Sequence, residues 1–181
     1  PPGRLLPAHA HRRAQLLYGA TGVMHVVTRD GNWVVPPQRA VWIPAGVTHQ
    51  VRMLDVSTRS AYVEPGAARA DRQACEVIEV SPLLRQLLLD AVDMPAEYDL
   101  AGRDGALAAL LLHEVERAPV LPLHIPLPRD KRLAPLCRAF IAAPDARAAP
   151  QTWAERLHMS PRTFSRHFRQ QTGMAFSEWR Q

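Results

Sequence analysis

Residues 152–173 read TWAERLHMSPRTFSRHFRQQTG, and this stretch predicts two short helices joined by a tight turn. The second helix is bounded by its own chemistry. Ser160 is a favoured N-cap residue, Pro161 suits the first helical position, and Gly173 can adopt the left-handed conformation that ends many helices. Both ends of this helix are therefore specified locally, and the stretch predicts a helix-turn-helix.

The two faces of the second helix differ in character. Phe164 and Phe168 stand four residues apart and share one face, which the apolar residues of the first helix can bury. The opposite face is polar and mostly basic, and arginine can bind guanine through its O6 and N7 atoms. A solvated basic face on an ordinary helical hairpin is the competing interpretation. The candidate DNA-binding residues, with Arg166 the strongest, are Arg162, Ser165, Arg166 and Arg169.

This stretch resembles the first helix-turn-helix of the AraC/XylS family of bacterial transcription regulators. The resemblance implies that the second helix enters the major groove, with base contacts from Arg162, Ser165 and Arg166 and a phosphate contact from Arg169. Family members carry a second helix-turn-helix after a long linking helix, whereas this sequence ends at Gln181, where that helix would begin. The first residue is proline and not methionine, so we expect part of a longer protein, truncated after the first helix-turn-helix. The matching residues are Leu157, Met159 to Arg162, Phe164, Arg166, Phe168, Thr172, Gly173 and Phe176 to Trp179.

Charge divides the sequence into two parts. Residues 129–181 carry 10 basic and 4 acidic side chains, whereas residues 1–128 carry 12 basic and 13 acidic ones. A basic part beside a near-neutral part is typical of a DNA reader joined to a domain with another task. Between them, four prolines in residues 119–128 exclude a continuous helix and predict an extended linker whose apolar residues lie against a domain surface.

The amino-terminal part contains short strand-like runs separated by turn residues, which is consistent with an antiparallel barrel or sandwich. A helix is expected to begin at Ser81-Pro82, and a second one over about residues 104–117; both have leucine-rich faces. The strands are expected over residues 15–18, 23–28, 33–35, 40–43, 48–54, 56–63 and 76–80.

Residues 9–15, HAHRRAQ, and residues 44–49, PAGVTH, resemble the two motifs of the cupins. In cupins a His-x-His, a carboxylate or amide, and a histidine after Pro-x-Gly converge on a divalent metal. The even spacing of the first three places them on one face of a strand. Three imidazoles suit Zn, Ni, Cu or Fe and leave coordination positions open. By this resemblance the candidate ligands are His9, His11, Gln15, which stands where glutamate is commoner, and His49.

The competing interpretation of these motifs is a metal-free barrel that offers only an apolar effector pocket, and the residues leave both open. Large apolar residues in a barrel are more often simply core. The candidates for lining such a pocket are Tyr18, Trp33, Trp42 and Met53. The remaining histidines lack a suitable spacing or point away from the interior, and they are His25, His113, His124, His158 and His167.

The order of these parts matches an AraC-type regulator over nearly the whole chain, and the barrel most resembles the subgroup that contains the nitroimidazole-resistance regulator. The predicted fold class is α+β. It comprises a cupin-like antiparallel β-barrel in residues 1–80, a helical pair in residues 81–118, the linker in residues 119–128 and an all-α, incomplete helix-turn-helix module in residues 129–181. In the family the barrel senses a small molecule and the helices after it commonly dimerise. The leucine-rich faces serve equally well to form a homodimer, cover the barrel or pack on the DNA-binding part.

These parts predict a ligand-responsive transcription regulator, not an enzyme, that binds double-stranded DNA and a small effector, with RNA polymerase a further candidate partner. The alternative is a metal-dependent cupin oxygenase or isomerase with an accessory helical domain, although the motif region offers no acid–base carboxylate. A module that binds acidic proteins is a third reading. No apolar run approaches the roughly 20 residues that span a bilayer. With only Cys75 and Cys137 no disulfide framework is indicated, and we expect a cytoplasmic protein.

Overall fold

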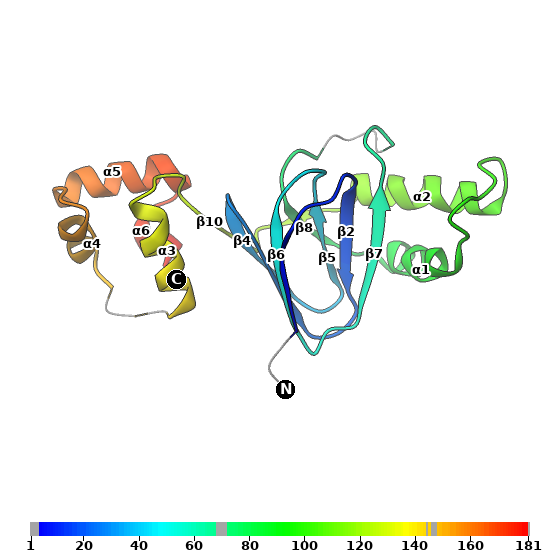
Figure 1. Cartoon of the computed structure of the whole chain (residues 1–181), viewed down its shortest axis with the longest axis horizontal. Coiled ribbons are helices and arrows are strands. Elements are labelled where there is room, and N and C mark those ends of the chain that lie inside the picture. Colours follow the sequence, from blue (N-terminus) through cyan, green and yellow to red (C-terminus); the bar gives the residue numbers. More distant parts are fainter. Residues whose placement is uncertain (1–3, 68–71, 144, 146–147, 181) are drawn as a thin grey trace. The chain divides into compact units, whose positions relative to one another are not determined.

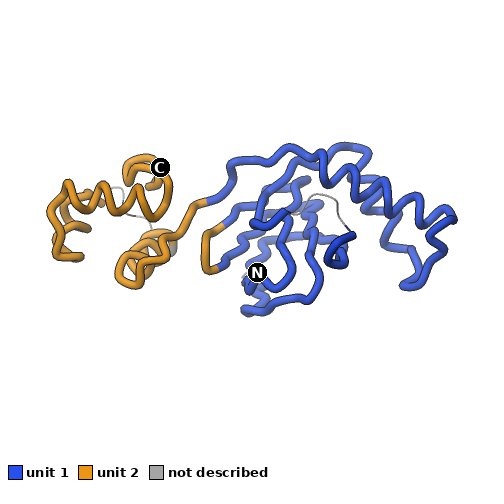
Figure 2. Tube along the Cα trace, turned by 90° about the horizontal axis from the view of Figure 1, so that it is seen from above, with its two compact units in different colours: residues 1–28, 33–124 blue, residues 29–32, 125–181 orange. Residues whose placement is uncertain are grey.

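The computed structural model describes residues 4–67, 72–143, 145 and 148–180. The expectation of a truncated protein concerns the two ends of the sequence, and these ends, Pro1 to Gly3 and Gln181, lie outside the described residues. The chain forms two compact units (Figure 2), of which unit 1 comprises residues 1–28 and 33–124 and unit 2 comprises residues 29–32 and 125–181. The boundary after residue 124 falls inside the stretch expected to be the linker.

Unit 1 is built on two antiparallel sheets (Figure 1). One sheet has the strand order β1-β6-β3-β4-β10 and the other the order β7-β2-β5-β8-β9. Together with the helices these sheets confirm the α+β prediction. The strands are β1 (Arg4–His9), β2 (Ala14–Gly19), β3 (Val23–Thr28), β4 (Gly31–Val35), β5 (Arg39–Ile43), β6 (His49–Leu54), β7 (Thr58–Val63), β8 (Glu76–Glu79), β9 (Val120–Leu121) and β10 (His124–Pro126).

The helices expected after Ser81 and after Ser160 begin where the sequence predicts. The Ser81 hydroxyl accepts a hydrogen bond from the Leu84 backbone N–H at 3.0 Å and caps the first helix. No helix in the described part of the chain is long and apolar enough to cross a membrane. The helices are α1 (Pro82–Asp90), α2 (Arg103–Arg117), α3 (Leu133–Ala142), α4 (Pro150–Arg156), α5 (Pro161–Thr172) and α6 (Phe176–Trp179), with a 3-10 turn, η1 (Ala91–Asp93).

The expected strands lie within two residues of their predicted bounds, but β1, β9 and β10 were not predicted. Each of these three contains or adjoins a proline, and each lies at the edge of its sheet. An edge strand tolerates proline because one side of its backbone needs no partner. The prediction that His9, His11 and Gln15 share one strand is wrong, since His9 ends β1, His11 lies in the connection, and Gln15 belongs to β2.

Alternation along the strands separates two apolar clusters in unit 1. Leu17, Val26 and Val51 point between the two sheets and belong to the inner cluster. Leu16 and Tyr18 point to the other face of the second sheet and pack beneath α1 and α2. Strand β2 is buried along its whole length because both of its faces are covered.

The leucine-rich faces of the helical pair cover the second sheet. Of the three roles left open by the sequence, covering the barrel is the one that the structure shows. Leu83, Val92 and Leu110 stay outside this contact, with exposed fractions of 46%, 57% and 42%. The homodimer stays a prediction. The helix residues buried in the outer cluster are Leu84, Leu87, Leu88, Leu107, Leu111 and Val115.

Arg72 holds the carboxyl-terminal end of α2. Its guanidinium group donates hydrogen bonds to the carbonyl oxygens of Val115, Glu116 and Ala118 at 3.1, 3.2 and 3.1 Å. It also pairs with the Glu76 carboxylate at 2.6 Å. A cation at this position satisfies the carbonyl groups that a helix end leaves without partners. The second sheet and α2 are therefore joined by polar contacts as well as by apolar packing.

Unit 2 contains the predicted helix-turn-helix around an aromatic core. Phe164 and Phe168 are fully buried, with ring centroids 5.6 Å apart. The Phe176 ring meets both edge-on, at 5.4 and 5.2 Å, an arrangement that aromatic quadrupoles favour. The predicted caps of α5 are confirmed, because the Ser160 hydroxyl accepts from the Thr163 N–H and Gly173 has a φ of 79°.

We expect Phe164→Ala to lower the free energy of unfolding of unit 2 by roughly 3–5 kcal/mol, the usual cost of truncating a buried phenylalanine. The exposed Gln170→Ala on the same helix should change it by less than about 0.5 kcal/mol. Urea denaturation followed by tryptophan fluorescence would measure both. Equal stability of the two variants would contradict the aromatic core described here.

Candidate metal centre and nucleic-acid interface

A cavity of about 210 Å³ opens between the two sheets of unit 1, and we call it the inter-sheet cavity. Its walls come from the strands at one end of each sheet, β1 and β6 on one side and β7 and β2 on the other. Because β1 and β7 are edge strands that do not pair with each other, the sheets are open here. The lining residues are Arg4, Leu6, His9, Gln15, Leu17, His49, Val51, Met53, Thr58, Ser60 and Tyr62.

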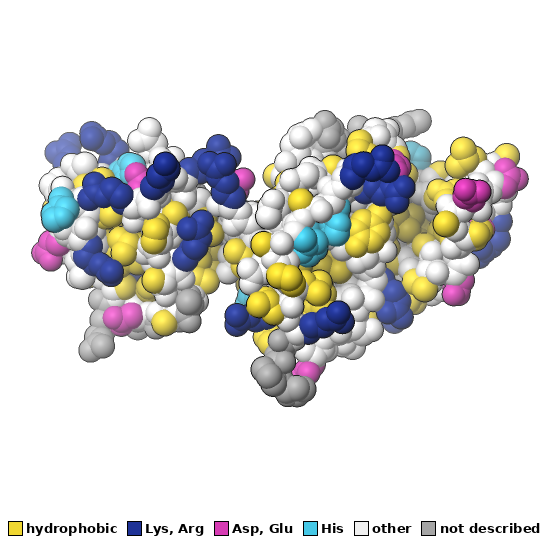
Figure 3. All heavy atoms as spheres, viewed as in Figure 1, with side chains coloured by type: hydrophobic (Ala, Val, Ile, Leu, Met, Phe, Trp, Pro, Cys, Tyr) yellow, Lys and Arg dark blue, Asp and Glu magenta, His cyan; other side chains and the backbone are white. Residues whose placement is uncertain are grey.

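Three histidines meet beside this cavity, and two of them, His9 and His49, line it. Candidate ligand nitrogens of His9, His11 and His49 all lie within 4.8 Å of one another, and the ring centroids are 4.4 to 5.3 Å apart. A β-bulge between Leu6 and His9 shifts the alternation of β1, so that His9 faces the same side as Leu6. Histidine side chains (cyan in Figure 3) reach the surface of unit 1. The structure thus brings together the three histidines predicted from the two motifs.

The loop that carries His11 and the loop that precedes His49 are tied together through the backbone. The Gly46 N–H donates to the His11 carbonyl oxygen at 2.8 Å. Gly46 has a φ of 76°, in the left-handed region that glycine adopts without strain. The positive φ explains why a glycine precedes His49 by three residues in the second motif.

Carbonyl groups orient two of the three imidazoles. The Nδ1 atoms of His9 and His49 lie 2.7 and 2.9 Å from the carbonyl oxygens of Pro7 and Val47. A carbonyl oxygen only accepts hydrogen bonds, so Nδ1 carries the proton and donates, which leaves a lone pair on Nε2. Metal-bound histidines are held in the same way, with the second ring nitrogen bonded to a carbonyl or carboxylate.

Buried polar atoms without partners converge on the same place. His11 Nε2, His49 Nε2 and Gln15 Oε1 are buried and have no hydrogen-bond partner among the described residues. Gln15 Nε2 donates to the Ser60 hydroxyl at 3.0 Å, which commits the amide nitrogen and leaves the oxygen free. Buried polar atoms in native proteins are nearly always satisfied. Two imidazole nitrogens and an amide oxygen together are donor chemistry that fits a divalent metal ion.

Burial lowers the pKa of His49 below its ordinary value, and the neighbouring His9 and His11 lower it further, against the hydrogen bond to Val47, which acts in the opposite direction. The neutral form of His49 is therefore favoured at neutral pH. A metal ligand must be neutral imidazole, so the electrostatics of the site agree with its geometry.

Of the four side chains expected to line an effector pocket, Met53 lies on the cavity wall. Trp33 belongs to the inner cluster away from the cavity lining, and Tyr18 and Trp42 belong to the outer cluster beneath the helices. The reason is alternation: on β2 and β5, residues 15, 17, 41 and 43 face inward, whereas residues 16, 18, 40 and 42 face the helices. The sequence shows the alternation but not which face the helices cover.

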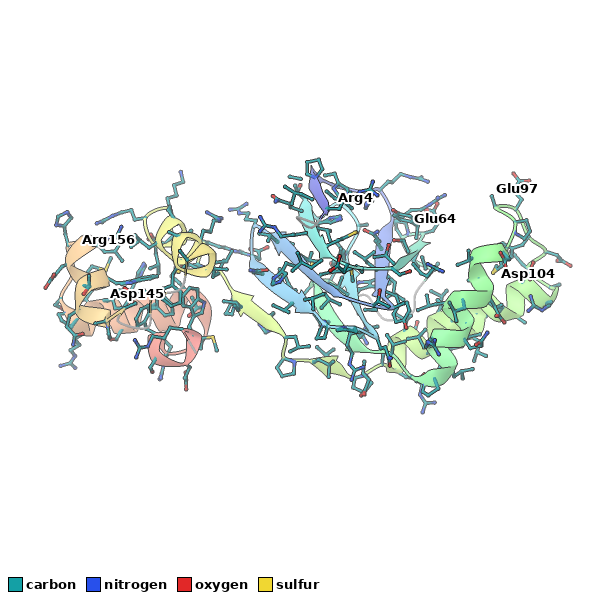
Figure 4. The ribbon with its side chains drawn as sticks, turned by 90° about the horizontal axis from the view of Figure 1, so that it is seen from below. Arg4, Glu64, Glu97, Asp104, Asp145 and Arg156 are labelled. Atoms are coloured by element: carbon teal, nitrogen blue, oxygen red, sulfur yellow. The ribbon has the colours of Figure 1, made fainter. Side chains whose placement is uncertain are left out.

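Sequence reasoning missed the opposite wall of the cavity. Thr58, Ser60 and Tyr62 occupy every second position of β7 and face inward. This alternation of polar residues was visible in the sequence. Arg4, labelled in Figure 4, lies on β1 and also lines the cavity, but β1 was not predicted as a strand.

In unit 2, α5 exposes all four predicted DNA-binding residues. Within the described residues, Arg162, Arg166 and Arg169 form no ion pair, so their guanidinium groups are available to a ligand. The Ser165 hydroxyl donates to the Pro161 carbonyl at 2.9 Å and is left to accept from a base or water. Figure 3 shows Lys and Arg side chains (dark blue) spread over the visible face of unit 2.

A polar contact also fixes the orientation of α5. It involves His167, to which the sequence assigns no role. His167 Nε2 lies 3.2 Å from Asp130 Oδ2, while Asp130 Oδ1 accepts from the Leu133 N–H at 2.8 Å at the start of α3. Hydrogen bonds to backbone N–H groups, with that of Leu133 the strongest cause, hold the pKa of Asp130 below its ordinary value. His167 and Asp130 are 37 residues apart in the sequence, so no local sequence pattern predicts their contact.

Comparison with known proteins agrees with this architecture. A profile of the AraC-like ligand binding domain matches residues 1–160, and one of bacterial regulatory helix-turn-helix proteins of the AraC family matches residues 154–181. The chain belongs to the AraC family. The HTH-type transcriptional regulator NimR of Escherichia coli (strain K12) is 29% identical over 176 residues, which cover 97% of this chain and 64% of NimR. The chain thus spans less than two thirds of that relative's length.

Solved structures of other proteins resemble this AraC-family chain more distantly. Apo ToxT from Vibrio cholerae is 7% identical and has a TM-score of 0.44, covering 98% of this chain and 73% of ToxT. Oxalate decarboxylase from Bacillus subtilis is 13% identical and has a TM-score of 0.30, covering 54% of this chain and 29% of that enzyme.

We expect the stability of unit 2 to fall as the pH drops through about 4, because Asp130 has a lowered pKa. Near and below the ordinary value of 3.8 the unfolded state takes up the proton more readily, so folding loses this contribution as the pH falls. Asp130→Asn keeps an oxygen for the Leu133 N–H but no longer accepts from His167.

This variant should be about 1 kcal/mol less stable at pH 6 and should lose less stability between about pH 5 and pH 3. Urea denaturation at several pH values, followed by tryptophan fluorescence, would measure both effects. An unchanged slope in the variant would contradict the proposed role of Asp130.

Proposed function

We propose that this AraC-family protein is a transcription regulator that binds double-stranded DNA through α5 and senses a small molecule in the inter-sheet cavity. The observation that carries the proposal is the pairing of a capped, basic-faced α5 with a separate unit that contains a polar cavity. Family membership supports both halves. No described Asp or Glu lines the cavity, which argues against an oxygenase or isomerase that needs a general acid or base.

Effector binding would act by changing the populations of two arrangements of the protein. A ligand shifts such an equilibrium only if it binds one arrangement more tightly, since equal affinity shifts nothing. The segment of residues 119–128 is suited to transmit the change. Val120 and Leu121 pair with β8 in unit 1, whereas Leu127 is buried in the aromatic core of unit 2.

For DNA binding, we expect selection from a random duplex library to yield a preferred sequence for the wild-type chain. Arg166→Ala should lose about 1–3 kcal/mol of discrimination at one base position, the usual worth of a bidentate arginine contact. Arg169→Ala should weaken binding to all sequences alike and reduce the salt slope by about 1. Fluorescence anisotropy at several salt concentrations would measure both effects.

Arg85→Ala is a matched control for the DNA experiment, because Arg85 is an exposed arginine on α1 in unit 1. It removes the same charge without touching the proposed reading face. Equal losses in the Arg166→Ala and Arg85→Ala variants would count against α5 as the reader, and so would competition by acidic protein but not by duplex DNA.

We further propose that His9, His11 and His49, with Gln15, bind a divalent transition metal such as Zn, Ni, Cu or Fe. The short separations of the nitrogens, the unpartnered ligand atoms and the resemblance to the cupin motifs support this. The metal would supply a Lewis acid with an open coordination position for a donor atom of the effector. Its protein ligands are held by the hydrogen bonds to Pro7, Val47 and Ser60 described above.

Elemental analysis of the natively purified protein should find one metal ion per chain. His11→Ala and His49→Ala should each lose it, because a three-imidazole site fails when one ligand is removed, whereas His25→Ala, on the outward face of β3, should retain it. Circular dichroism would confirm that the variants fold. Equal metal content in all four proteins, or none in the wild type after metal supplementation, would refute the site.

A further inference from the structure

The inter-sheet cavity carries positive charge that no neighbouring acid balances. Arg4 lines the cavity and forms no ion pair among the described residues, and no described Asp or Glu lines it. Glu64, which follows β7, is committed elsewhere: its carboxylate pairs with Arg12 at 3.1 Å and with Arg13 at 2.5 Å. The charged side chain in the described cavity lining is therefore a cation, which is itself exposed to solvent.

The proposed ligand set adds to this charge. His9, His11, His49 and Gln15 are all neutral donors, so a divalent ion that they hold keeps both of its charges. A glutamate in place of Gln15 would cancel one of them. Charge inside a protein is costly unless it is paired, so a site of this composition favours an anionic exogenous ligand.

The shape of the cavity limits the size of that ligand. On β1 and β6, His9 is paired with His49 and Arg4 with Met53, so the histidines and Arg4 lie at opposite ends of the slot. Four residues of strand separate these pairs by about 13 Å, at roughly 3.3 Å per residue. The volume of about 210 Å³ is smaller than the roughly 300–1,000 Å³ of pockets for drug-sized molecules.

The walls between the two ends differ in chemistry. Leu17 and Val51 present apolar surface from the two sheets, and the hydroxyls of Thr58 and Ser60 lie along β7. Such a slot suits a short molecule with an apolar body and one charged group. Few polar contacts are needed to orient it, because the charged end is already specified by the site.

We propose that the effector is a small carboxylate whose acid group binds at the three-histidine end and whose apolar body extends past Leu17 and Val51 toward Arg4. The proposal rests on the proposed metal site and names the class of ligand that this site takes. Gln15 sets the preference for an anion by leaving the metal charge uncancelled. Arg4 is exposed at the other end of the slot and adds only a weaker, solvent-screened attraction for anions.

The test uses the whole chain loaded with Co(II), whose visible absorption changes when a ligand enters its coordination sphere. Benzoate and benzamide serve as probes because they match in shape and differ in charge. Benzoate should change the Co(II) spectrum and bind roughly tenfold or more tightly than benzamide. Calorimetric titration would give both affinities independently of the spectrum.

Three variants sharpen the test. Gln15→Glu should retain Co(II) and lose roughly tenfold or more in benzoate affinity, because the added carboxylate cancels one charge. Arg4→Gln should weaken benzoate by about twofold or less and leave benzamide unchanged, because Arg4 is exposed and lies about 13 Å from the histidine end, beyond the Debye length. Arg52→Gln is the matched control, since Arg52 is an exposed arginine on β6 that faces away from the cavity, and it should behave as the wild type.

The outcomes separate this inference from the proposed function. If the wild-type chain does not bind Co(II), the metal site is refuted and the carboxylate proposal with it. If Co(II) binds but benzamide binds as tightly as benzoate, or Gln15→Glu leaves benzoate affinity unchanged, the metal site stands and the carboxylate proposal alone is overturned.

Discussion

The burial of strand β2 on both faces is the constraint on which unit 1 depends. The even-numbered residues Leu16 and Tyr18 are buried by α1 and α2. The odd-numbered residues Gln15 and Leu17 point between the sheets. The helical pair is therefore part of the fold of unit 1. The same alternation places a polar amide and an apolar side chain side by side on the cavity wall, which is how one strand contributes both to the proposed metal site and to the proposed ligand slot.

In unit 2 the corresponding constraint is the aromatic core. Phe164 and Phe168 are fully buried against α4 and α6, which fixes the rotation of α5 and turns its arginines outward. The contact between His167 and Asp130 adds a second, polar constraint on the same helix and connects it to the start of α3. A reading helix needs such constraints, because base recognition depends on placing guanidinium groups within hydrogen-bonding distance of base edges.

Features set by local chemistry could be predicted from the sequence, and features set by long-range contacts could not. The two ends of α5 could be predicted from Ser160 and Gly173. The grouping of the three histidines could be predicted from two short motifs. The edge strands were missed because proline argues against a strand unless its edge position is known. Tyr18 and Trp42 could be placed neither in a pocket nor in the core from the sequence, because it does not show which sheet face the helices cover; both lie in the outer cluster. Arg4 was missed with the strand that carries it.

The proposed mechanism also requires that the connection between the units be easy to alter. The chain crosses from one unit to the other at both ends of the short segment 29–32, and again after residue 124. Near the second crossing, β9 has two residues, and they pair with Val77 and Ile78 of β8. A backbone hydrogen bond contributes about 0.5–1.5 kcal/mol net, so this ladder is held by only a few kcal/mol. Val77 belongs to the inner cluster together with Leu17 and Val51 of the cavity wall, so a ligand that repacks this cluster acts on a weakly held strand. A few kcal/mol is also the range that a small ligand's differential affinity can supply.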